Sequence, residues 1–170
     1  RALEEPLTVA YLGPAYTFTY LAARHRLGFQ PEYLDCPSLQ DVFDAVERGR
    51  ANVGVVPIEN SLSGAVPETL DRLVTTDLNV IGEHYEPIEQ CLLAACTIEE
   101  VRRIHTHPQA AAQCRHWLRE NLPGTQIVNQ SSTAAAARMA SEEPGSAAIG
   151  PAEAGEAYGL RVLARAIQDY

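Results

Sequence analysis

Side chains that could bind or protonate a small molecule cluster in four short stretches, at residues 14–19, 57–64, 106–109 and 131–133. Each stretch follows an apolar run that predicts a strand and precedes a run that predicts a helix. The loop from a strand to a helix lies at the carboxyl end of an α/β sheet, where such sheets bind ligands. Unpaired N–H groups at the helix start favour an anion. We therefore expect the four loops to bind a ligand with one or two carboxylates.

Each of these loops also fits an ordinary structural role. Thr17, Ser132 and Thr133 are equally typical of helix N-caps with no further function. Glu59 is also consistent with a side chain that faces water, Asn60 with a left-handed turn residue, and His107 with a packed core histidine. From the residues alone, the pattern supports binding of a small anion and leaves the chemistry open.

Composition excludes several classes of protein. The chain has 170 residues, of which 46% are hydrophobic and 21% charged, as in a globular protein. A net charge of −9 argues against nucleic acid as a partner, and the apolar runs are too short to span a membrane. No basic segment followed by an apolar one opens the sequence, so we expect a cytoplasmic protein. All 13 basic residues are Arg, which excludes Schiff-base and P-loop lysine chemistry.

The cysteine and histidine patterns predict neither disulfides nor a metal site. The four cysteines lie in apolar or helical settings without a CxxC spacing, so we interpret them as reduced core thiols. The five histidines also lack the spacing of a zinc motif. We therefore expect no metal site.

The order of predicted elements favours an α/β fold in two lobes. In the first part, strands are predicted at 7–12, 33–36 and 53–56, each followed by a helix, at 17–27, 42–48 and from Pro67. Residues 75–79 are a plausible boundary. After it we predict strands at 80–85, 88–95, 104–106, 126–128, 147–149 and 162–163, and helices at 98–101, 110–121, 134–140 and 151–158.

This pattern predicts a first lobe at 1–76, a second at 77–165, and the start of a return crossover at 166–170. We expect a ligand-binding cleft between the lobes, with an architecture like that of type II periplasmic binding proteins. In that arrangement, residues 55–64 and 131–133 would face each other across the cleft.

Five motifs, in order along the chain, resemble those of the prephenate dehydratase catalytic domain, found alone or fused to chorismate mutase. They are AYLGP at 10–14 with TFT at 17–19, VVPIENS at 55–61 with Gly64, THPQA at 106–110, STAAA at 132–136, and YGL with IQD at 158–160 and 167–169. Any one of them is weak evidence, but five with similar spacing are strong.

The resemblance implies conversion of prephenate, a dicarboxylate, to phenylpyruvate, carbon dioxide and water, without cofactor or metal. It also implies a homodimer, which the apolar segment at 88–95 is consistent with. Residues that would bind substrate are Thr17, Thr19, Asn60, Ser61, Gly64, His107, Gln109 and Ser132. Glu59 and Thr133 are the predicted catalytic residues. The alternative function is a module that binds a carboxylate without turning it over.

Two departures from the family pattern bear on activity. Tyr16 stands where the family has Gly, so a positive φ there would cost about 1–2 kcal/mol. The family's T-R-F motif, whose Thr is regarded as the catalytic acid, and its ACT domain do not occur within the 170 residues. We therefore expect slower prephenate turnover from these residues than from a chain that extends through that motif.

Overall fold

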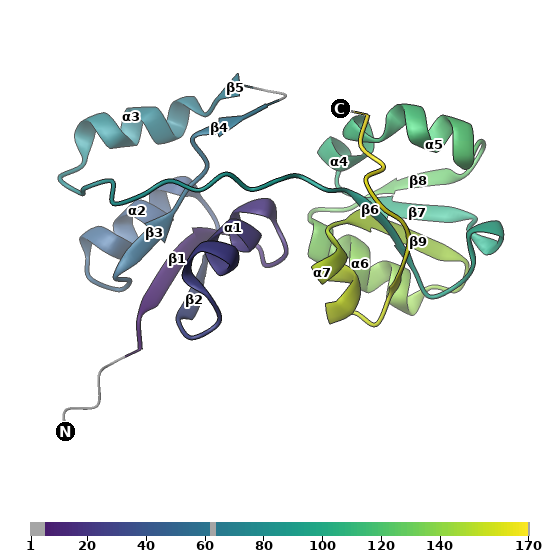
Figure 1. Cartoon of the computed structure of the whole chain (residues 1–170), viewed down its shortest axis with the longest axis horizontal. Coiled ribbons are helices and arrows are strands. Elements are labelled where there is room, and N and C mark those ends of the chain that lie inside the picture. Colours follow the sequence, from purple (N-terminus) through teal and green to yellow (C-terminus); the bar gives the residue numbers. More distant parts are fainter. Residues whose placement is uncertain (1–5, 62–63, 170) are drawn as a thin grey trace. The chain divides into compact units, whose positions relative to one another are not determined.

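The computed structural model of the protein is a mixed α/β structure (Figure 1). It divides into two compact units, residues 1–86 and 87–170. The structure describes residues 6–61 and 64–169. Leu62 and Ser63 of the second candidate loop lie outside the described residues, as do both termini. The predicted division into 1–76, 77–165 and a crossover at 166–170 stays a prediction.

Unit 1 is built on a parallel three-stranded sheet in the order β2 (Glu32–Cys36), β1 (Thr8–Leu12), β3 (Val53–Val55). Alternate residues of β1 enter two apolar clusters, Ala10 with residues of α2 (Leu39–Glu47), and Val9 and Tyr11 with Ala23 of α1 (Phe18–Leu27). Because successive strand residues point to opposite faces, the two helices cover opposite faces of the sheet.

The loop after β3 differs from the polar loop that the sequence predicts. It forms a short antiparallel hairpin of β4 (Glu59–Asn60) and β5 (Gly64–Ala65) before α3 (Pro67–Thr75) begins. Thr69 of α3 is fully buried, and its hydroxyl donates to the carbonyl of Pro57 at 2.7 Å. This bond fixes the start of α3 to the end of β3.

The strand predicted at 80–85 is wrong. Residues 76–90 contain no helix or strand, and Val80, Ile81 and Tyr85 are 71%, 80% and 85% exposed. Their apolar side chains imitate a strand pattern, but no neighbouring strand pairs with this segment among the described residues.

Unit 2 is a five-stranded sheet in the order β10 (Arg161–Ala164), β6 (Cys91–Ala94), β9 (Ser146–Gly150), β7 (Arg103–Thr106), β8 (Gln126–Asn129). β8, β7 and β9 are parallel, whereas β6 is antiparallel to both of its neighbours. Figure 1 shows α4 (Pro108–Gln113) and α5 (Arg115–Asn121) on one side of this sheet, and α6 (Thr133–Glu142) and α7 (Ala152–Ala157) on the other. A short 3₁₀ helix, η1 (Ile98–Glu100), joins β6 to β7.

The single helix predicted at 110–121 is two helices that break at Cys114, whose φ and ψ are −113° and 15°. Asp169, which lies near the carboxyl terminus of unit 2 in the sequence, explains the break. Its carboxylate accepts hydrogen bonds from the N–H groups of His116 and Trp117 at 3.0–3.3 Å, and its own N–H donates to the Gln113 carbonyl at 2.7 Å. No helix among the described residues has the length and apolar content to cross a membrane.

Candidate functional site

The structure brings the predicted site residues together in two groups, one in each unit. In unit 1, β1 and β3 are parallel neighbours, so their carboxyl ends lie on the same side of the sheet. The loop before α1 and the hairpin β4–β5 follow these two strand ends. In unit 2, β7 and β8 are parallel neighbours, so His107 and Ser132 also follow one edge. The cleft predicted between the lobes, and the pairing of 55–64 with 131–133 across it, stay predictions.

The hydroxyl of Thr17 is occupied within its own loop. Thr17 is the N-cap of α1: its Oγ1 accepts from the Tyr20 N–H at 3.3 Å and donates to the Leu12 carbonyl at 3.2 Å. Phe18 and Thr19 are the first two helical residues, whose N–H groups have no carbonyl partner one turn earlier. The donors that this helix start presents to a ligand are therefore backbone N–H groups.

The residue before Thr17 has the positive φ that the family's glycine would suggest. Tyr16 has a φ of 66°, in the left-handed region that costs a non-glycine residue about 1–2 kcal/mol. Its ring packs edge-on against Tyr20, with ring centroids 5.4 Å apart, and Tyr20 in turn lies 5.3 Å from the ring of Tyr11. The aromatic contacts offset part of this strain.

The hairpin residues differ in burial. Glu59 and Ser61 are exposed and Asn60 is half-buried, while Gly64 has a φ of 74°, which suits glycine. The catalytic role predicted for Glu59 stays a prediction. Asn60 and Ser61 remain the amide and hydroxyl that this edge presents.

His107 lies at the start of α4 and has one ring nitrogen engaged there. It is the N-cap of α4, and its Nδ1 accepts from the Gln109 N–H at 3.3 Å. An accepting Nδ1 in a neutral ring places the proton on Nε2, which is then a donor. Gln109 is exposed at the same helix start.

Ser132 and Thr133 open α6 in different ways. Ser132 is the N-cap, and its Oγ accepts from the Ala135 N–H at 3.0 Å, which leaves its O–H as a donor. Thr133 is the first helical residue and lies against the end of β9: a Cβ added to Gly150 would lie 2.4 Å from Thr133 Cγ2. Gly150, which is not among the residues predicted from the sequence, allows the start of α6 to approach β9 this closely.

Behind this edge, a hydrogen-bonded network fixes the strands of unit 2. Gln130 donates to Nδ1 of the buried His105 at 2.9 Å, which leaves Nε2–H to donate to Glu143 Oε2 at 2.6 Å. Burial, together with the charge of Arg103, lowers the pKa of His105 and favours its neutral form. Arg103 and Ser146 also bond to the Glu143 carboxylate, so the network joins β7, β9 and the end of α6.

A hollow of about 600 Å³ lies at the other end of α6, lined by residues such as Cys96, Glu100 and Glu143. None of the motif residues lines it. The motifs therefore point to the sheet edges, and not to this hollow, as the candidate site.

The sequence matches the family model described as prephenate dehydratase over residues 9–170. The bifunctional chorismate mutase/prephenate dehydratase of Aquifex aeolicus is 44% identical over 169 residues, which cover 99% of this chain and 47% of that protein. The chain spans about half the length of the curated relatives it matches.

Two solved structures are similar over nearly all of the chain. The prephenate dehydratase of Arthrobacter aurescens, in complex with L-Phe, is 37% identical with a TM-score of 0.83, and the match covers 96% of this chain and 56% of that one. GqqA, described as a novel type of quorum quenching acylase, is 36% identical with a TM-score of 0.81, covering 95% of this chain and 60% of that one.

Proposed function

The chain belongs to the prephenate dehydratase family, and on that premise we propose that it serves the decarboxylative dehydration of prephenate to phenylpyruvate, in phenylalanine biosynthesis. The observation that carries the proposal is the position of the motif residues: in each unit they lie in helix starts, or in the β4–β5 hairpin, that follow the carboxyl ends of neighbouring parallel strands.

The reaction needs donors more than it needs acids or bases. Loss of the ring carboxylate moves electrons toward the ring, and the hydroxyl on the far side leaves as water. Because aromatisation drives both steps, the protein has to hold two carboxylates and hydrogen-bond the departing hydroxyl. The loops are built to present such donors.

In unit 2, the proposed carboxylate donors are His107 Nε2–H, the Ser132 hydroxyl and the first N–H groups of α6. In unit 1, they are the first N–H groups of α1, together with Asn60 and Ser61. Hydrogen bonds to a charged group contribute about 1.5–3 kcal/mol each, so two or three of them account for micromolar to millimolar binding.

We assign the leaving hydroxyl to Thr133. A Thr hydroxyl is a poor acid at neutral pH, so it acts by a hydrogen bond that strengthens in the transition state. The proposed role of Glu59 is to orient Asn60 or a water molecule. Thr19, Gly64 and Gln109 complete the proposed binding loops.

The test is to add prephenate to the chain and follow phenylpyruvate by its absorbance in alkali, beside calorimetry of prephenate binding. Thr133→Val removes the hydroxyl but keeps the methyl group that lies near Gly150. Loss of a transition-state donor typically costs about 10²–10³ in rate, so kcat should fall by that factor while Kd changes little.

Thr97→Val is the matched control. Thr97 is also a helix N-cap in unit 2, but it follows β6, which is antiparallel to β9 and therefore ends at the opposite edge of the sheet. This variant should keep both kcat and Kd. Binding of prephenate without phenylpyruvate formation would favour the carboxylate-binding module, and absence of both would refute the proposal.

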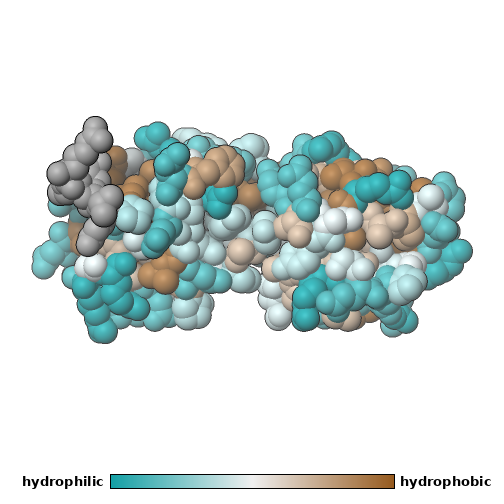
Figure 2. All heavy atoms as spheres, turned by 90° about the horizontal axis from the view of Figure 1, so that it is seen from below, coloured by the Kyte–Doolittle hydropathy of each residue, from teal (hydrophilic) through white to brown (hydrophobic). Residues whose placement is uncertain are grey.

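We further propose a cytoplasmic homodimer. The four cysteines, all free thiols, support the compartment. The dimer no longer draws support from 88–95, because its strand β6 is fully buried in the middle of the sheet. Its support is the exposed Val80, Ile81 and Tyr85, and Figure 2 shows apolar patches scattered among hydrophilic residues on one face. Light scattering that finds a monomer at micromolar concentration would contradict the dimer.

A further inference from the structure

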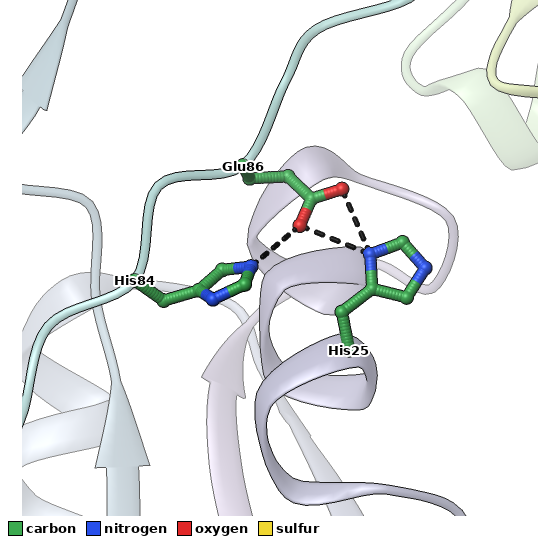
Figure 3. Close-up of side chains that lie close together, drawn as sticks. All are labelled: His25, His84 and Glu86. Atoms are coloured by element: carbon green, nitrogen blue, oxygen red, sulfur yellow. Dashed lines mark hydrogen bonds and ion pairs between the residues drawn. The ribbon is translucent and has the colours of Figure 1, made fainter.

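Three potential metal ligands from separate parts of the sequence meet in unit 1 (Figure 3). His25 lies in the last turn of α1, and His84 and Glu86 lie in the extended segment 76–90. Glu86 Oε1 and Oε2 are 2.9 and 3.0 Å from His25 Nδ1, and Oε2 is 2.9 Å from His84 Nε2. One carboxylate therefore faces two imidazole nitrogens.

The surroundings hold this arrangement in place. The Glu86 side chain is only 11% exposed, whereas those of His25 and His84 are 46% and 30% exposed. His84 and Glu86 are two residues apart in extended chain, a spacing that places side chains on the same side. The carboxylate is thus sheltered while a path from solvent remains along the imidazoles.

The nitrogen–oxygen distances are close to those between ligand atoms around a metal ion. One ligand atom from each of the three side chains lies within 4.8 Å of the other two. A tetrahedral ion with bonds of about 2.0–2.1 Å separates its ligand atoms by about 3.3 Å. The observed nitrogen–oxygen distances of 2.9–3.0 Å would have to open by only a few tenths of an ångström.

The ligand types select among ions. Two imidazoles with one carboxylate suit Zn²⁺ and similar transition metals, whereas Ca²⁺ and Mg²⁺ prefer sites made of oxygen atoms. Three protein ligands leave a fourth tetrahedral position for water. The net charge of −9 also favours the binding of a cation.

We propose that His25, His84 and Glu86 form a Zn²⁺ site that fastens segment 76–90 to helix α1. This segment has no helix or strand, and the Glu86 carboxylate joins it to α1 through His25 while also bonding to His84 within the segment. Zn²⁺ replaces these hydrogen bonds by stronger bonds to the same atoms. Its binding therefore stabilises unit 1 against unfolding.

The first experiment is calorimetric titration of the chain with ZnCl₂ alone. It uses a Cys96→Ser background, because Cys96 is the one partly exposed thiol of the four and could compete for the ion. One Zn²⁺ per chain is expected. Co²⁺, used as a spectroscopic substitute, should give the intense visible absorption of a tetrahedral site.

The variants are His25→Ala, His84→Ala and Glu86→Gln, of which the last keeps the shape of the side chain. Loss of a second-shell partner already lowers metal affinity by about 10–100-fold, so loss of a direct ligand should weaken Zn²⁺ binding at least about tenfold. Zn²⁺ should also raise the melting temperature of the parent chain and leave that of the variants unchanged.

His116→Ala is the matched control. His116 is also an exposed histidine, and its Nε2 lies 3.2 Å from the Glu120 carboxylate. That pair contains only one histidine, so it offers one imidazole fewer than the proposed site. It should keep full Zn²⁺ affinity. Absence of one-to-one binding, or equal binding by the Glu86→Gln variant and its parent, would overturn the proposal. The three residues would then form only a hydrogen-bonded cluster.

Discussion

At the scale of single residues, the loop between β1 and α1 depends on Tyr16, whose φ is 66°. A Cβ in this conformation costs about 1–2 kcal/mol, while the Tyr16–Tyr20 ring contact returns about 0.5–1.5 kcal/mol. Because the two effects are of similar size, Tyr16→Gly alone would not separate them.

Comparing Tyr16→Gly with Tyr16→Ala isolates the backbone strain, because both variants lack the ring. Gly loses the strain but gains about 0.4–1 kcal/mol of unfolded-state entropy. We therefore expect the Gly variant to be more stable than the Ala variant by up to about 1.6 kcal/mol. Urea unfolding followed by circular dichroism measures the difference.

Ala22 inside α1 provides the control. There, Ala22→Gly should lower stability by about 1 kcal/mol, since glycine is a poor helix former at ordinary helical φ. If the Ala variant at position 16 were the more stable of that pair, Tyr16 would carry no strain, and the tolerance of tyrosine in this loop would need another explanation.

Single residues were predictable where the signal is local. The caps Thr17 and Ser132, which the sequence analysis names, each accept a hydrogen bond from the N–H three residues ahead. The cluster of His25 and Glu86 was not, because 61 residues separate them and only the folded unit brings them together. The expectation of no metal site rested on spacing alone, which such a cluster does not obey.

At the scale of elements, α5 begins where Asp169 provides a cap. The sequence showed a continuous helical pattern at 110–121, and its hydrophobic periodicity gave no sign of a break. The break depends on a carboxylate that lies 53 residues away along the chain. Helices with local caps were predicted closely, whereas this one required a partner from outside the segment.

Asp169→Ala should destabilise unit 2 by about 1 kcal/mol, the usual effect of losing a helix N-cap. Two N–H groups at the start of α5 lose their acceptor, although the Asp169 backbone bond to Gln113 can remain. Trp117, the single tryptophan of the chain, lies in α5 and reports the unfolding of this unit by fluorescence.

Asp169→Asn is the matched control, because its amide oxygen can still accept a hydrogen bond. It should retain most of the stability that Asp169→Ala loses. Equal loss in both variants would mean that the negative charge near the helix start, and not the cap, supplies the stabilisation.

At the scale of the whole molecule, the apolar clusters around β1, and the cluster around β6 and β7, each lie within one unit in the part of the chain that the structure describes. The clusters around β1 contain only residues of unit 1, and the cluster around β6 and β7 contains only residues of unit 2. The alternating strands and helices predicted the α/β class of both units. The order of strands in unit 2 could not be predicted from the sequence, because pairing between distant strands depends on the packing of the complete sheet.

Separate cores predict that the two units unfold in separate transitions. Trp117 packs on the unit 2 cluster, and the buried Cys36 belongs to a unit 1 cluster. Burial raises the pKa of the Cys36 thiol, which suppresses its reaction until unit 1 opens. In a urea titration, Trp117 fluorescence and pulsed thiol labelling of Cys36, located by peptide mass spectrometry, should therefore give different midpoints.

The variants at Asp169 and Tyr16 make this prediction stringent. Asp169→Ala should lower the midpoint reported by Trp117 and leave that of Cys36 labelling in place, because the lost cap belongs to unit 2. The Gly and Ala variants at Tyr16 should change the midpoint of Cys36 labelling and leave the midpoint reported by Trp117 in place, because Tyr16 belongs to unit 1. Mutations in independent cooperative units act only on their own transition, whereas units coupled by an interface of several kcal/mol unfold together. A single shared midpoint that moves with every variant would therefore show one cooperative unit, and the separation of cores would not extend to stability.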